Sequence, residues 1–120
     1  MTHTDDRPHV LSASTVTNDT VVNAEGDELG TIEDVMLDVD DDRIAYAVLS
    51  FGGFLGIGSK LFAVPWTALT LDAENERFVL DVPREKLEAA PGFDKSDWPD
   101  FADRSFGRTI HEYYDRPVYW

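Results

Sequence analysis

The sequence contains no cysteine, very little lysine and no long apolar run, and each shortage narrows the possibilities. Without cysteine, the 120-residue chain can form no disulfide bond, thiolate metal site or cysteine nucleophile. No apolar stretch approaches the roughly 18–20 residues that a membrane-spanning helix needs. The first residues lack the basic and apolar segments of an export signal. We therefore expect a cytoplasmic protein without a membrane span.

Basic residues are scarce, and the resulting negative charge is concentrated in one part of the chain. The formal net charge is −14, with ten Lys and Arg against 24 Asp and Glu. Residues 14–83 alone hold fourteen acidic and three basic residues, which gives a net charge of −11. Such a surface repels phosphate backbones, so direct binding to nucleic acid is not expected. Since only three residues are lysine, we also predict an adaptation to high salt.

The usual motifs of catalysis are missing as well. Of the three histidines, His3 and His9 lie near the N-terminus, and the residues around His111 do not match the spacing of a helical metal motif. The serines lack the setting of a nucleophile elbow, and no pair of carboxylates stands in contrasting environments. We therefore expect a protein that is not an enzyme and uses no cofactor.

The chain is rich in short segments of strand-forming residues. They lie at residues 20–23, 29–39, 43–51, 61–64, 70–71 and 78–82, and polar or glycine-containing turns separate them. In the second segment Val35, Leu37 and Val39 alternate with polar residues and Met36, so they should share one face. The third segment is apolar on both faces, which is typical of a central strand. Short strands with close turns and no long crossover predict a mainly β fold, a small antiparallel barrel or sandwich.

The character of the sequence changes after Pro83. Residues 83–89 predict a short helix with proline at its start. Residues 96–114 predict helix in two pieces, with Gly107 as a weak point. We therefore divide the chain into a flexible N-terminal arm at residues 1–13, a barrel at residues 14–83 and a helical, aromatic-rich extension at residues 84–120.

An ordered set of short motifs runs through the middle of the chain. In their order, these motifs are Val22 and Asn23; Gly26, Leu29, Gly30, Ile32 and Asp34; the acidic turn Asp40, Asp41 and Asp42; Gly52, Gly53 and Phe54; Gly56 and Gly58; and Val64, Pro65 and Trp66. The set resembles the PRC-barrel family, which includes a domain of the photosynthetic reaction-centre H subunit and the C-terminal domain of a ribosome-maturation factor. The resemblance covers residues 14–83 and implies a barrel of about six strands with an assembly or adaptor role.

A glycine-rich loop at residues 52–60 is the first candidate interaction surface. Its tip carries the apolar residues Phe54, Leu55 and Ile57. Exposed contiguous apolar side chains usually mark a contact surface. The alternative is that these side chains fold back onto the barrel.

The C-terminal extension is the second candidate surface. Seven of the fourteen aromatic residues lie in the last 23 positions, and so much apolar area should not stay in water. Either the extension packs on its own barrel, or it packs on a second copy of the chain. The arginines among the rings favour the second arrangement, and with it a homodimer or higher oligomer. The residues concerned are Trp98, Phe101, Phe106, Ile110, Tyr113, Tyr114, Tyr119 and Trp120.

The acidic turn is a weak candidate for a metal site. Asp38, Asp40 and Asp42 match the opening D-x-D-x-D of a calcium-binding loop. However, Arg43 and Leu49 stand where such a loop needs glycine and glutamate. An ordinary acidic hairpin turn is the alternative.

Together these features predict a non-catalytic interaction or scaffold module that self-associates and docks a further protein partner, which the sequence does not name. The second hypothesis is a regulatory protein that binds a small ligand or a divalent metal, at the acidic turn or in a pocket at one end of the barrel.

Overall fold

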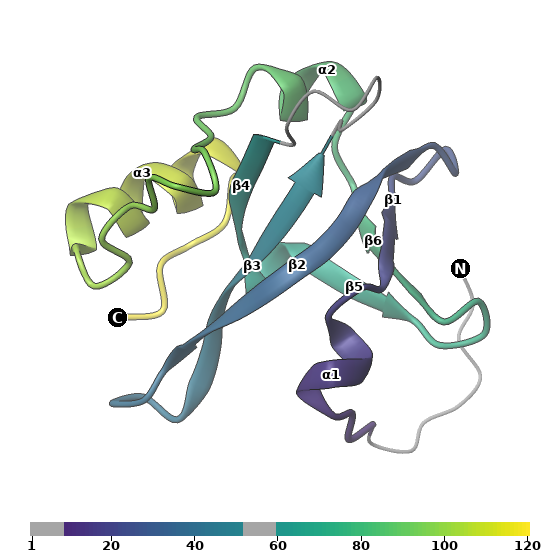
Figure 1. Ribbon diagram of the computed structural model, residues 1–120, viewed down its shortest axis with the longest axis horizontal. Helices are drawn as coiled ribbons and strands as arrows, with labels where there is room; N and C mark the ends of the chain where they lie inside the picture. Colours follow the sequence, from purple (N-terminus) through teal and green to yellow (C-terminus); the bar gives the residue numbers. More distant parts are fainter. Residues whose placement is uncertain (1–8, 52–59) are drawn as a thin grey trace.

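The computed structural model describes residues 9–51 and 60–120, in which short strands come first and most of the helix comes last (Figure 1). The elements are α1 (Ala13–Val16), β1 (Thr20–Val22), β2 (Glu28–Asp38), β3 (Arg43–Phe51), β4 (Lys60–Pro65), a 3-10 turn (Trp66–Ala68), β5 (Leu69–Asp72), β6 (Arg77–Leu80), α2 (Arg84–Glu88) and α3 (Arg104–Tyr113).

The six strands form one curved sheet in the order β4-β3-β2-β1-β6-β5, which makes a half-barrel. The predicted mainly β fold of about six strands is therefore confirmed. The prediction that all pairs would be antiparallel is wrong at one place, because β1 and β6 run parallel, with Val21 opposite Phe78. This pair joins the first strand to the last, so the local turn signals that predict antiparallel hairpins carry no information about it.

Strand β3 lies at the centre of the core, as its sequence predicted. Residues 45–49 of this strand are all buried, and β3 pairs with β2 on one side and β4 on the other. At Gly30 of β2 the backbone φ is +155°, and a Cβ there would collide with the carbonyl oxygen of Ser50 on β3. Glycine is therefore required for the close approach of the two strands.

Strand β2 does not alternate regularly between the two faces of the sheet. Its register against β3 shifts between Ile32 and Asp34 and again between Met36 and Leu37. A bulge changes which side of a strand faces the core. At the first shift the extra residue is Glu33 of β2, and it is exposed together with Asp34. Farther along β2, Val35 is partly buried and Leu37 is exposed.

The C-terminal extension is less helical than its sequence predicted. Helix α2 forms where expected, but residues 96–103 are turns and irregular chain. Proline at position 99 disfavours helix in the residue before it. Helix α3 begins only after Asp103, whose carboxylate accepts the Ser105 backbone N–H at 2.9 Å. The short helix α1, which the sequence did not predict, is capped in a similar way by Ser12.

Helix α3 lies beside β4 and β3 at one end of the molecule (Figure 1). The core extends without interruption from the sheet into this helix. Within the described parts of the chain, no helix has the length and apolarity to cross a membrane.

Candidate interaction surface

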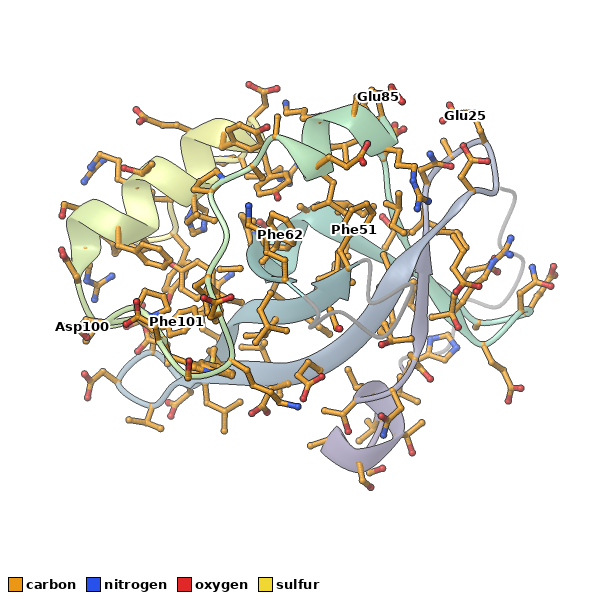
Figure 2. All side chains as sticks on the ribbon, turned by 45° about the horizontal axis from the view of Figure 1, so that its top comes forward. Glu25, Phe51, Phe62, Glu85, Asp100 and Phe101 are labelled. Atoms are coloured by element: carbon orange, nitrogen blue, oxygen red, sulfur yellow. The ribbon has the colours of Figure 1, made fainter. Side chains whose placement is uncertain are left out.

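A groove of about 240 Å³ lies between the β2–β3 hairpin and the C-terminal extension. In Figure 2 this end of the molecule carries the labels Asp100 and Phe101. The groove has two walls from opposite ends of the sequence, which we call the hairpin wall and the tail wall. The hairpin wall comprises Met36, Leu37, Asp38, Val39, Asp40, Ala45 and Tyr46, and the tail wall comprises Phe101, Ala102, Arg104, Tyr119 and Trp120.

The tail wall belongs to a continuous group of rings that packs on the sheet. The Tyr46 ring of β3 lies 5.5 Å from that of Phe101 and 5.7 Å from the imidazole of His111, measured between centroids. Tilted and edge-to-face contacts at such distances are favourable for aromatic pairs. His111 links this group to Trp120 at 5.3 Å. The last residues of the sequence are therefore packed against the central strand.

Gly107 makes this close packing possible. A Cβ at Gly107 would lie 2.7 Å from the Cη2 atom of Trp120 and would also collide with the Tyr46 hydroxyl. At the residue that the sequence marked as a weak point of the helix, the helix therefore lies close to both the strand residue Tyr46 and the C-terminal Trp120. Ring packing around a residue without a side chain compensates for its low helix propensity.

His111 has a structural role in this group. Its side chain is buried, and Nδ1 lies 2.8 Å from the carbonyl oxygen of Gly107, one turn earlier in α3. At this distance a protonated Nδ1 donates a hydrogen bond to that carbonyl. His111 is therefore a packing residue of this group of rings.

Two arginine side chains stack on aromatic rings of the tail wall. The Arg43 guanidinium stacks 3.8 Å from the centre of the Tyr119 ring, and that of Arg104 lies 4.6 Å from the Trp120 ring. Cations above aromatic faces are attracted by the ring quadrupole. The positive charges of Arg43 and Arg104 are therefore both held against rings.

A hydrogen bond joins the two walls. The Tyr119 hydroxyl donates to Oδ2 of Asp38 at 2.5 Å. This bond lowers the pKa of Asp38 below its usual value. Burial, together with the Asp38 carboxylate, raises the pKa of Tyr119 to about 12. Since the bond spans most of the sequence, it ties the end of the chain to the start of the β2–β3 turn.

The hairpin wall exposes apolar residues. Leu37 is 65% exposed and Val39 is 76% exposed, whereas most large apolar side chains of the described residues are buried or partly buried. They lie beside the acidic turn that follows β2. Sequence reasoning missed both residues as site candidates, because period-two alternation grouped them with Val35. Their position next to three consecutive aspartates was the signal that could have identified them.

The acidic turn is a hydrogen-bonded hairpin turn. Oδ1 of Asp38 accepts the backbone N–H groups of Asp40 and Asp41, each at 3.2 Å. Asp42 has a φ of +54°, a conformation that Asp tolerates better than most residues. Across the described ranges, no three His, Asp or Glu side chains cluster closely enough to hold a metal ion. The structure therefore gives no support to the predicted site at Asp38, Asp40 and Asp42.

The predicted surface residues have different environments. Ile110 and Tyr114 are buried in the core of their own chain, and Trp98 is the only exposed member of the predicted tail set, at 37%. Phe101, Phe106, Tyr113 and Tyr119 are partly buried and pack against that core, and Trp120 is partly buried beside His111. The predicted loop surface of Phe54, Leu55 and Ile57 lies outside the described residues. Packing of the tail on its own barrel, the first of the two arrangements left open by the sequence, is thus the one in this structure. Self-association stays a prediction.

Comparison with known proteins agrees with this architecture. A model of the PRC-barrel domain matches residues 8–87, two-thirds of the chain. All six strands lie inside the matched range, and α3 lies after it. No curated protein matches the chain. The chain belongs to the PRC-barrel domain family.

Proposed function

We propose that this protein is a non-catalytic interaction module that docks a protein partner at the groove between the hairpin wall and the tail wall. Membership of the PRC-barrel family supports the general role of a small module, often one that interacts with proteins. The observation that carries the specific proposal is the exposure of Leu37 and Val39 beside a groove lined with aromatic rings.

These two neighbouring side chains leave apolar surface in water beside the groove, although most large apolar side chains of the described residues are buried or partly buried. Burial of apolar surface contributes roughly 25 cal/mol per Å². The tail shows how this chain covers apolar area where no partner is needed, because its rings pack on one another and on Tyr46. Leu37 and Val39 have no such cover. A partner that covers them and enters the groove would gain the free energy that the isolated fold leaves unused.

Site-specific photo-crosslinking in the native host tests this proposal. A benzophenone amino acid is placed at position 39, and in a matched control at position 10, where the native valine is even more exposed, at 94%. We expect a discrete covalent adduct with a protein from position 39 and none from position 10. Absence of an adduct at position 39, or the same adducts from both positions, would contradict the proposal.

Self-association is a separate prediction with its own test. Most of the tail aromatics that motivated this prediction pack against the core of their own chain, so a second copy is not needed to cover them. Light scattering of the purified protein across the micromolar range distinguishes the two states. A mass of twice 13.5 kDa or more would support self-association, and the mass of one chain would rule it out at these concentrations.

The alternative function is the binding of a small regulatory ligand or a divalent metal, at the acidic turn or in a pocket of the barrel, and this groove is one candidate site for it. At about 240 Å³ the groove is slightly smaller than typical small-molecule sites, which span roughly 300–1,000 Å³. This size favours a single inserted side chain over a cofactor-sized ligand. Thermal shifts with a panel of metabolites and divalent metals test the alternative.

A further inference from the structure

We infer that the partner segment that docks in this groove is cationic and apolar: one large apolar side chain enters the groove, and Lys or Arg residues on either side of it face the surrounding aspartates. The inference rests on the proposed docking function and specifies the chemistry of the partner.

The hairpin side of the groove is strongly acidic. Asp38, Asp40, Asp41 and Asp42 surround the exposed Leu37 and Val39 in sequence, and the last three of these aspartates are exposed. Of these four carboxylates, that of Asp38 accepts a hydrogen bond from the opposite wall, donated by the Tyr119 hydroxyl. The three other carboxylates have no cationic partner among the described residues.

The opposite side adds further negative charge. Asp100 and Asp103 flank the tail-wall residues at positions 101 and 102, and both are exposed. The positive charges near these walls belong to Arg43 and Arg104, and both are held over rings. The groove is thus an apolar surface within a mostly negative rim, and a partner gains both specificity and association rate when its charges are opposite.

The same charges exclude a symmetric contact between two hairpin walls. A two-fold contact places the same patch of both chains together. It would bring the aspartates of both turns face to face, and like charges in such a contact cost several kcal/mol. Nucleic acid is disfavoured by the same repulsion. A positively charged protein segment with an apolar residue is the occupant that satisfies both the rim and the groove.

Fluorescence anisotropy with defined peptides tests the inference on the full chain. The probe is a labelled synthetic peptide with a central Leu-Phe pair between two Lys-Arg-Lys blocks. One control peptide has Ser-Ser at the centre, and another has Glu in place of every Lys and Arg. We expect the probe to bind at least about tenfold more tightly than either control, since both burial and charge pairing contribute.

Substitutions in the protein test whether the probe peptide binds in the groove. The double substitution Leu37→Ser/Val39→Ser should lower the affinity for the probe peptide by about tenfold, because the apolar contact is lost while every charge remains. The double substitution Asp40→Asn/Asp41→Asn should lower the affinity for the probe peptide about three- to tenfold at low salt, and less at high salt. The matched control is Glu25→Gln/Glu74→Gln, which changes the net charge equally at exposed turns outside the groove. It should change the affinity by less than about twofold.

Two results would overturn the inference. If the aspartate variant at positions 40 and 41 and the control variant at positions 25 and 74 lower the affinity equally, the peptide responds to the net charge of the protein and not to this groove. If the glutamate peptide binds as well as the probe, the charge assignment is wrong. The photo-crosslinking experiment separates these failures from failure of the docking function. An adduct at position 39 whose partner segment lacks Lys and Arg would retain the docking function and refute the cationic segment.

Discussion

The two walls of the groove differ in how much of their apolar side chains they expose to solvent. The tail wall belongs to the part of the sequence with the highest density of aromatic residues, yet the structure buries or half-buries nearly all of them. The hairpin wall buries Ala45 and Tyr46, which belong to β3, but it leaves Leu37 and Val39 in solvent. The number of apolar residues in a segment therefore does not show whether the segment is an interface.

Packing geometry accounts for the difference. The tail can reach Tyr46 because Gly107 has no side chain, and its rings then cover one another. The β2–β3 hairpin extends beyond the core, so Leu37 and Val39 near its turn stay in solvent. In this molecule the aromatic tail packs within the fold, and the short hairpin is the surface that we propose for a partner.

The largest expected effect tests whether the tail belongs to the core. Ile110→Ala should lower the free energy of unfolding by about 2–5 kcal/mol, because Ile110 is fully buried where α3 meets the sheet. Leu37→Ala is the matched control, since it removes a similar volume from an exposed site. Urea denaturation measures both. Equal effects of the two substitutions would show that α3 does not pack on its own barrel in solution.

The second prediction concerns the close contact at Gly107. Gly107→Ala should destabilise the protein by about 1–3 kcal/mol, because the added methyl group collides with Trp120 and Tyr46. In an open helix the same change would stabilise by about 1 kcal/mol. Arg108→Ala, at the exposed next position, serves as the control. Thermal unfolding with a rise in melting temperature for Gly107→Ala would contradict the observed packing of the tail.

A smaller effect should appear in the pH dependence of stability. The folded-state pKa of Tyr119, about 12, lies above its usual value of 10.0. Its contribution to stability is therefore complete below pH 10 and is lost as the pH rises towards 12. The pKa of Asp38 is lowered from 3.8, so the contribution of Asp38 is present above that value and is lost as the pH falls below it.

Tyr119→Phe removes the hydrogen bond behind the Asp38 shift and the titrating hydroxyl itself. Compared with the unsubstituted protein, this variant should lose less stability at both pH extremes. Denaturant titrations at neutral pH, near pH 3 and near pH 11 measure the difference. Identical pH profiles of the two proteins would show that the two walls are not linked in solution.

The smallest effect on stability is expected at the hairpin wall. Leu37→Ser/Val39→Ser should change the free energy of unfolding by no more than about 0.5 kcal/mol, because both side chains are already in water. The same variant should lose the crosslinked partner in the host. A large loss of stability would mean that these residues pack within the fold, which would remove the basis for the docking surface.

Most of the fold could be predicted from the sequence, whereas most of the site could not. The strands, the central position of β3 and the family follow from strand-forming segments and an ordered set of glycine, acidic and Val-Pro-Trp motifs. The parallel pairing of β1 with β6 did not follow, because it joins segments whose contact is not encoded in any local turn. The position of α3 was partly visible, but the start of the helix depended on the Asp103 cap.

The sequence by itself determined the β content, the concentration of negative charge in the barrel and the aromatic richness of the tail, because these depend on residue type and short-range spacing. Only the tertiary structure decided which apolar residues are covered. That outcome depends on contacts between distant parts of the chain, such as the Tyr119–Asp38 hydrogen bond across 81 positions. Burial is a property of packing, and packing brings together residues that no local pattern relates.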